Sequence, residues 1–222
     1  MPYRRTANVA RKLAARHDAI LAAACEAAAQ GGMAAVQIAP VAARAGIATG
    51  TVYRYFPSKT DLVAALAAAL GEREMAALEG AAKAAPGPLS ALAAAISTFA
   101  ARALERRRLA FALMAEPVEP EVDRARASYR QALVGAFEQL IRKALGAGRL
   151  PDQDAALAAP ALLGALVEGL LGAHAPAPDD PAKARAQVQM LTLFALRALG
   201  VVDARARGLV VQTVMPQPSG KS

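Results

Sequence analysis

The stretch of sequence that decides the fold is AGIATGTVYRYFPSK, residues 45–59. Gly46 stands where a short helix must stop, because only glycine adopts a positive φ without steric cost. On the helix that follows, Ala48, Val52 and Phe56 recur every four residues and are predicted to face inward. The stretch therefore predicts two short helices joined by a turn, with a further helix starting directly after them.

The opposite side of the second short helix carries residue types that contact nucleic acids. They are Thr49, Gly50, Thr51, Tyr53, Arg54 and Tyr55. A helix that presents such side chains after a tight turn is typical of the helix-turn-helix, whose second helix enters the major groove of DNA. We therefore expect double-stranded DNA to be a partner of this chain.

Positive charge is concentrated at the N-terminal end of the chain. Residues 1–60 contain eight Lys or Arg and two acidic residues, and the rest contains 18 basic and 16 acidic residues. The net charge of +8 is thus divided into +6 and +2. A basic end of this kind is the electrostatic signature of a phosphate-binding domain. On charge alone, a basic surface that only maintains solubility is the alternative.

The composition predicts an all-α fold. Hydrophobic residues make up 55% of the chain and aromatic residues only 4%, and the commonest apolar residue is alanine, the strongest helix former. Apolar periodicity and Pro or Gly breaks predict helices at residues 11–30, 38–45, 59–84, 89–104, 107–114, 121–145, 154–173 and 181–199, besides the helix that ends before Pro57. After Gly200 the periodicity is lost, which indicates a flexible tail.

The sequence also limits the compartment and the membrane interpretation. Cys25 is the single cysteine, so no disulfide within one chain is possible, and the N-terminus has no apolar leader, which together favour the cytoplasm. Residues 155–175 are almost uncharged, which makes them a candidate membrane span. Pro160 and Glu168 within this segment favour a buried helix instead, because an acid in the bilayer costs about 2.5–3.5 kcal/mol.

Taken in order, the N-terminal motifs resemble the tetracycline-repressor (TetR) family of bacterial one-component regulators. The resemblance covers residues 16–66. It rests on Ile20-Leu21-x-Ala23-Ala24, Gly31-Gly32, Val41-Ala42-x-x-Ala45-Gly46-Ile47 and Gly50-Thr51-Val52-Tyr53-x-Tyr55-Phe56-x-Ser58-Lys59-x-x-Leu62. The last string is specific, whereas a helix-turn-helix alone is a modest signal.

The resemblance implies a role for each matching residue. Thr49, Thr51 and Arg54 would reach base edges, and Gly50 would let the backbone approach DNA closely. The resemblance further implies that Tyr53, Tyr55 and Lys59 bind phosphates and that Gln37 caps the helix starting at residue 38. Packing between helices is the alternative for both tyrosines. Ala48 departs from the serine usual at that position, and this loses about 1 kcal/mol of capping.

The resemblance also implies the organisation of the chain and its partners. It predicts a helix-turn-helix domain over residues 1–57, a helical ligand-binding and dimerisation domain over 58–200, and leaves 201–222 as the tail. The helices at 154–173 and 181–199 would pair across a two-fold axis. Their leucines supply more apolar surface than one small domain can cover, which independently favours a homodimer.

A small, largely apolar effector is predicted to bind inside the C-terminal domain. The candidate lining residues are Phe99, Phe111, Met114, Tyr129, Leu133, Phe137, Leu166 and Glu168. The alternative is that they fill a closed core. A buried Glu168 would favour a neutral hydrogen-bond donor or a cation over a carboxylate, and the alternatives for Glu168 are a contact across the dimer or a solvated position.

An enzyme and a purely structural helical protein are the rival interpretations. The chain has no glycine-rich phosphate loop and only two histidines, His17 and His174, so metal or triad chemistry has few candidates and no cofactor is expected. A structural protein would leave the charge asymmetry and residues 46–59 unexplained. We therefore expect a ligand-responsive, DNA-binding repressor that is not an enzyme.

Overall fold

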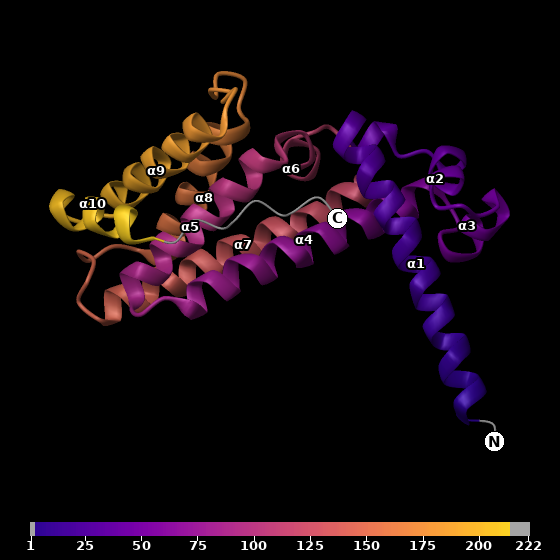
Figure 1. Ribbon diagram of the computed structural model, residues 1–222. Helices are drawn as coiled ribbons and strands as arrows, with labels where there is room; N and C mark the ends of the chain where they lie inside the picture. Colours follow the sequence, from indigo (N-terminus) through magenta and orange to yellow (C-terminus); the bar gives the residue numbers. More distant parts are fainter. Residues whose placement is uncertain (1–2, 214–222) are drawn as a thin grey trace.

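The computed structural model describes residues 3–213, with side chains from residue 9 onward, and this part of the chain is helical without strands (Figure 1). The all-α prediction is therefore confirmed. In chain order the elements are α1 (Tyr3–Gly31), the 3₁₀ helix η1 (Met33–Ala35), α2 (Ile38–Arg44), α3 (Thr49–Tyr55), α4 (Lys59–Ala84), α5 (Pro88–Glu105), α6 (Arg107–Met114), α7 (Pro120–Gly146), α8 (Ala155–Leu171), α9 (Pro181–Ala198) and α10 (Asp203–Gln212).

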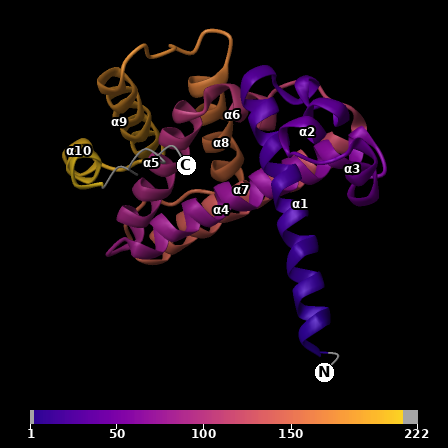
Figure 2. The ribbon, with the colours of Figure 1, turned by 45° about the vertical axis from the view of Figure 1, so that its right-hand side comes forward.

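The first three α-helices form a small unit at one end of the molecule (Figure 1). Its core contains Ile20 and Ala24 of α1, Val41 of α2, and Val52 and Phe56 at the end of α3. The first helix begins earlier than the sequence pattern predicts, and Figure 2 shows its N-terminal half standing clear of the rest.

Helix α4 leaves this unit and runs the length of the molecule (Figure 1). Its start is fixed by a capping box, in which the Ser58 hydroxyl accepts from the Asp61 amide at 3.0 Å and the Asp61 carboxylate accepts from the Ser58 amide at 3.0 Å. Ser58 followed three residues later by an acid is close to the sequence signature of a capping box, and the structure confirms the prediction that this signature makes.

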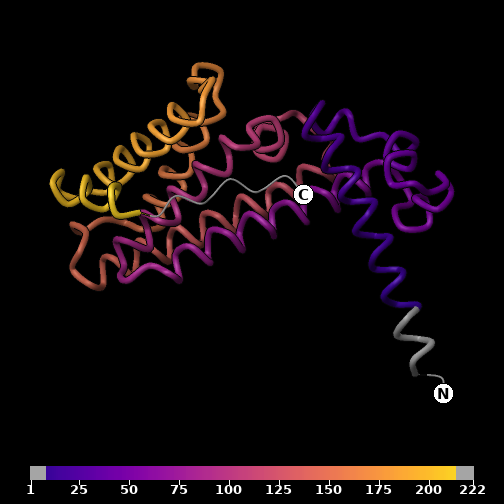
Figure 3. Tube along the Cα trace, viewed as in Figure 1, coloured from indigo at the N-terminus to yellow at the C-terminus, as the bar shows by residue number. Residues whose placement is uncertain are grey.

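Helices α4 and α7 lie side by side and run in the same direction, as the trace in Figure 3 shows. The Thr60 hydroxyl near the start of α4 donates to Glu119 Oε2, just before α7, at 2.6 Å. Farther along, a side chain on Gly71 of α4 would come within 3.0 Å of the Tyr129 side chain of α7. Any larger residue at position 71 would require α7 to shift by a few tenths of an ångström, so Gly71 favours the close spacing of the two helices.

Helices α8, α9 and α10 complete the second body (Figure 1). Helix α9 packs on α5, and there the buried hydroxyls of Ser97 and Thr192 are 3.0 Å apart. The expected flexible tail from residue 201 is wrong for its first half, because Asp203–Gln212 forms α10 and buries Ala206 and Leu209 against the core. The helix is short and its apolar pattern is weak, so periodicity alone does not predict it. Residues 214–222 of the expected tail lie outside the described residues.

Candidate DNA-binding surface and ligand cavity

The turn between α2 and α3 has the geometry that its sequence predicts. Gly46 adopts φ +66°, and no atom lies within 4 Å of the side chain it lacks, so the conformation itself requires glycine. Helix α3 then begins at Thr49 after an extended Ala48, which offers no side-chain cap. Ala48 is exposed, so the expectation that it faces inward is wrong: as the residue before the helix it lies outside the helical periodicity.

One side of α3 is open to solvent. Thr49, Gly50, Tyr53 and Arg54 are exposed and Thr51 is half-buried, whereas Val52 is fully buried. The predicted division of α3 into an inner and an outer side is thus present in the structure. The outer side offers two short hydroxyl side chains, one guanidinium and one phenol within two turns of helix.

Two residues of the predicted DNA-contact set are placed differently. The Tyr55 hydroxyl is buried and lacks a hydrogen-bond partner in the described residues, and its ring lies 6.4 Å from the His17 ring. Tyr55 therefore packs against α1 and does not present its hydroxyl to a phosphate. Gln37 stands at the N-cap of α2, but its side chain donates to the Ala34 carbonyl at 3.0 Å and caps nothing. An amide side chain longer than that of serine reaches back to η1, which the sequence pattern does not reveal.

Lys59 is the first residue of α4 and is half-buried at the edge of a groove of about 380 Å³. The amides at this helix start carry partial positive charge, so an anion is favoured there. Asp61 already accepts a hydrogen bond from the Ser58 amide in the capping box, so it pairs one of the donors at this helix start. Lys59 adds a basic side chain at the start of α4, a few residues after the end of α3.

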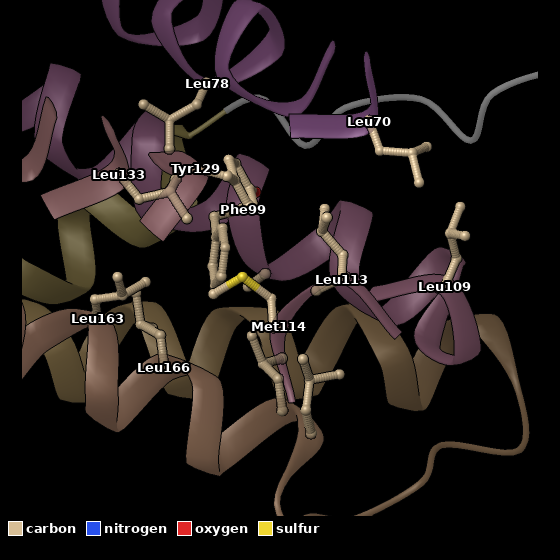
Figure 4. Packing of buried hydrophobic residues seen from close by; sticks show 14 of the residues in the cluster. Leu70, Leu78, Phe99, Leu109, Leu113, Met114, Tyr129, Leu133, Leu163 and Leu166 are labelled. Carbon is tan, nitrogen blue, oxygen red and sulfur yellow. The ribbon is translucent and has the colours of Figure 1, made fainter. Parts of the chain in front are cut away.

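The second body contains a small cavity of about 40 Å³ between α4, α5, α6, α7 and α8. This is space for about three water-sized groups. Three of the predicted lining residues, Phe99, Met114 and Tyr129, border it, and Figure 4 shows them converging. The rest of the wall is Leu70, Glu74, Arg102, Ala103, Arg106, Leu109, Ala110, Leu113 and Leu171.

The other predicted lining residues do not reach the cavity. Leu133, Phe137 and Leu166 are fully buried and belong to the core around it, and Phe137 supports Phe99 through an edge-to-face contact at 6.4 Å. Phe111 is 39% exposed, and Glu168 is also exposed. The expectation of a buried acid at Glu168 is therefore wrong, because the acid lies on the solvent side of α8.

The polar end of the cavity is an ion pair that sequence reasoning missed. Arg102 donates to both Glu74 carboxylate oxygens at 2.5 and 2.8 Å, and both side chains are mostly buried. The hydrogen bonds to Glu74 raise the pKa of Arg102 above its usual value. Burial likewise raises the pKa of the Tyr129 phenol, so this wall carries a neutral hydroxyl beside a neutralised pair. The sequence signal is weak, since the two residues lie 28 positions apart on different helices.

The segment between α6 and α7 connects the cavity to the N-terminal unit. Leu113 and Met114 of α6 line the cavity, and two residues later Glu116 accepts a hydrogen bond from the Met33 amide at 2.9 Å. The carboxylate fills the space beside Gly32, where φ is +77° and an added side chain would meet it at 2.6 Å. The cavity wall and the residue that binds η1 are therefore two positions apart along one chain.

Two arginines of α7 hold the C-terminal end of α6. Arg126 is only 5% exposed and donates to the carbonyls of Leu113, at 2.8 Å, and of Glu116. Arg130 donates to the Met114 carbonyl at 2.9 Å. Burial lowers the pKa of Arg126, but its partners are carbonyls at a helix end, where positive charge is favoured. The carbonyls left over at the end of α6 are thus paired by another helix.

The predicted dimer helices leave large apolar side chains uncovered. Leu157 of α8 and Met190 and Phe194 of α9 are each more than half exposed. Small residues of α8, Ala161, Gly164 and Ala165, are exposed as well. These six residues, which we call the α8–α9 face, form a surface that the single chain does not bury.

Within residues 3–213, no helix is long and apolar enough to cross a membrane, and no group of His, Cys, Asp and Glu has an arrangement that could hold a metal ion. Instead, the described chain combines an N-terminal helix-turn-helix with a helical body that contains a cavity. This combination is typical of one-chain regulatory proteins that bind DNA.

Comparisons with known proteins find similarity in the N-terminal part of the chain. The model of bacterial regulatory proteins of the tetR family matches residues 20–66. The HTH-type transcriptional repressor KstR of Mycolicibacterium smegmatis is 52% identical over 56 residues, which span 25% of this chain and 26% of that protein. The chain thus matches about a quarter of the length of its curated relatives. The N-terminal residues 20–66 are therefore similar to the DNA-binding part of the tetR family.

Solved structures extend the likeness of fold to most of the chain. RolR in complex with resorcinol has a TM-score of 0.66 at 24% identity and covers 95% of this chain and 100% of its own. FadR from Bacillus subtilis in complex with stearoyl-CoA has a TM-score of 0.63 at 20% identity, with 88% and 98% covered. At these identities the comparison establishes a shared fold.

Proposed function

We propose that this protein is a homodimeric transcriptional repressor that binds a near-palindromic DNA operator and is released by a small molecule. The observation that carries the proposal is the open side of α3, which follows the Gly46 turn and rests on buried Val52. Its support is the match of residues 20–66 to a family of regulatory proteins, together with relatives named as repressors over this domain.

In this proposal the exposed residues of α3 and the first residue of α4 contact either bases or phosphates. Thr49, Thr51 and Arg54 contact base edges in the major groove, and Gly50 lets the backbone approach the DNA. Tyr53 donates its hydroxyl to a phosphate, and Lys59 binds a second phosphate at the start of α4. Tyr55 has no part in DNA contact, because its hydroxyl is buried.

Dimerisation through the α8–α9 face would place two copies of α3 for the two halves of an operator. Leu157, Met190 and Phe194 supply the apolar centre, and the small residues of α8 allow the partner helices to approach closely. The two half-sites are then bound together, which raises the affinity for a near-palindrome far above that for one half.

The effector in this proposal is a small molecule with an apolar body and a hydrogen-bonding group. The cavity has apolar walls and one polar end, formed by the Glu74–Arg102 ion pair and by Tyr129, whose hydroxyl is available to donate a hydrogen bond to a ligand. Its volume of about 40 Å³ suits a compact molecule after modest side-chain movement, in the size range of the resorcinol bound by RolR and far below the stearoyl-CoA bound by FadR.

Release would follow from unequal binding to two arrangements of the protein. A ligand that enlarges the cavity pushes on Leu113 and Met114, and this displacement passes to Glu116 and η1. The ligand shifts the population only by the factor by which it prefers the form that cannot bind DNA. A second route in this proposal is α4, because it lines the cavity with Leu70 and Glu74 and begins at Lys59.

The proposal is tested by selecting duplexes from a random pool with the wild-type protein and measuring their affinity for variants. Thr51→Ala and Tyr53→Ala should weaken binding at least tenfold while the protein stays dimeric, and Ser128→Ala on α7 serves as the control. Lys59→Ala should weaken all duplexes alike and lower the salt slope by about one unit for each phosphate that is no longer bound. If no sequence is enriched, or if both α3 variants bind as tightly as wild type, the proposed function is wrong.

A further inference from the structure

The N-terminal half of α1 projects from the DNA-binding domain as a single helix. Residues 9–16 are exposed on every side, and the buried part of α1 begins only at Ile20. Figures 1 and 2 show this half standing clear of the molecule in both views. A solvated single helix is marginally stable in water, so a projection of this length is best explained by a second molecule that contacts it.

The charge of this projection identifies the chemistry of that second molecule. The first 17 residues contain Arg4, Arg5, Arg11, Lys12 and Arg16 and no acidic residue. Lys12 and Arg16 are four residues apart and therefore lie on the same side of the helix, and both are exposed. A basic helix of this composition is complementary to a regular array of negative charges such as a phosphate backbone.

The base of the projection lies beside the C-terminal end of α3. The His17 ring is 5.3 Å from the Phe56 ring and 6.4 Å from the Tyr55 ring, at the C-terminal end of α3. Lys59, which we assign to a phosphate, follows a few residues later. A duplex seated on α3 therefore runs past the point at which the projection leaves the domain.

We infer that residues 9–16, here called the basic arm, form a second DNA-binding element that contacts phosphates flanking the half-site read by α3. The inference rests on the proposed function, since α3 places the duplex. From residue 9 to residue 16 the helix extends about 12 Å, at 1.5 Å per residue. This length corresponds to about four base pairs at 3.4 Å each. The arm adds affinity without sequence preference, because phosphate contacts carry no base information.

The experiment compares two lengths of the selected duplex. The short duplex contains only the sequence that the selection enriches. The long duplex carries roughly eight more base pairs on each side, which is more than the arm can span. Wild-type protein and Lys12→Ala/Arg16→Ala are titrated with both duplexes at several salt concentrations. Alanine is the best helix former, so the substitutions do not melt the arm. The control is Arg149→Ala/Arg205→Ala, which removes two exposed charges at the opposite end of the molecule.

We expect the wild type to bind the long duplex more tightly than the short one. Two phosphate contacts per protomer make four per dimer, so this advantage should shrink about 100-fold between 50 and 200 mM salt. The arm variant should lose the advantage while keeping wild-type affinity for the short duplex, and the control should keep both. A variant that retains the full length advantage would overturn the inference.

Two further outcomes would assign the basic arm a different role. Loss of affinity for both lengths alike in the arm variant would place the arm within the core site and overturn a flanking role. Arm-dependent binding of wild type to phosphatidylglycerol vesicles, without any dependence on duplex length, would assign the arm to a membrane surface. Failure of the proposed function is recognised separately, because Thr51→Ala would then leave the affinity for the short duplex unchanged.

Discussion

Replacing Gly32 by alanine should break the hydrogen bond that joins the α6–α7 segment to η1 in the N-terminal unit. The added methyl group would lie 2.6 Å from Glu116 Oε2, too close for any non-bonded contact, so the carboxylate must leave. Its hydrogen bond from the Met33 amide would be lost with it. Gly32→Ala therefore combines two costs, backbone strain at φ +77° and the loss of this hydrogen bond.

The magnitude follows from adding these two costs. Gly32 has φ +77° and ψ −174°, a region that is essentially restricted to glycine, and a side chain there costs about 1–3 kcal/mol. The lost hydrogen bond costs about 1 kcal/mol, since the carboxylate regains water. We expect Gly32→Ala to lower the free energy of unfolding by about 2–4 kcal/mol in total. Gly46→Ala is the control for backbone strain without a clash, because Gly46 has φ +66° and nothing within 4 Å.

The assay is urea unfolding followed by circular dichroism at fixed protein concentration, for both glycine variants, Glu116→Ala and the double variant Gly32→Ala/Glu116→Ala. The double variant should be about 1 kcal/mol more stable than the sum of the two single effects predicts, because both single variants lose the same hydrogen bond. Equal stability of Gly32→Ala and Gly46→Ala, combined with strict additivity in the double variant, would refute the reasoning.

Three other predictions concern the cavity, the dimer and the cysteine. Arg102→Ala should cost about 1–3 kcal/mol in urea unfolding because it leaves Glu74 unpaired, and Arg102→Met combined with Glu74→Gln should recover most of that loss. Phe194→Arg should give monomers in light scattering, whereas Val202→Arg, at a position at least as exposed, should stay dimeric; monomers from both would remove the α8–α9 face as the interface. Burial raises the pKa of Cys25 above 9.0, so its alkylation at pH 8 should be slower in native than in urea-unfolded protein, and equal rates would contradict this placement.

Much of the helical architecture could be predicted from the sequence because its signals are local. The Gly46 turn, the buried Val52 and the capping box at Ser58 depend on residues within a few positions of one another. The start of α4 at Lys59 is therefore predicted at the right residue. Local signals fail where the apolar pattern is weak, as in α10, where only Ala206 and Leu209 are buried.

The cavity could be predicted only in part because its wall is made by distant residues. Phe99, Met114 and Tyr129 are recognisable as large apolar side chains on separate helices. The pairing of Glu74 with Arg102 depends on how α4 packs on α5, and no spacing in the sequence reports that packing. The prediction for Glu168 is wrong for a related reason: apolar neighbours along a helix do not determine which side of that helix faces the core.

The pairing of the α6 carbonyls by Arg126 and Arg130 has a consequence for the order in which the molecule opens. Helix α6 has eight residues, too few to be stable alone, and its C-terminal end depends on side chains from α7. Amide hydrogens of α6 should therefore exchange with solvent through local opening, at lower free energy than those in the middle of α4 or α7. Since α6 forms one wall of the cavity, the same local opening would give a small molecule a route into it.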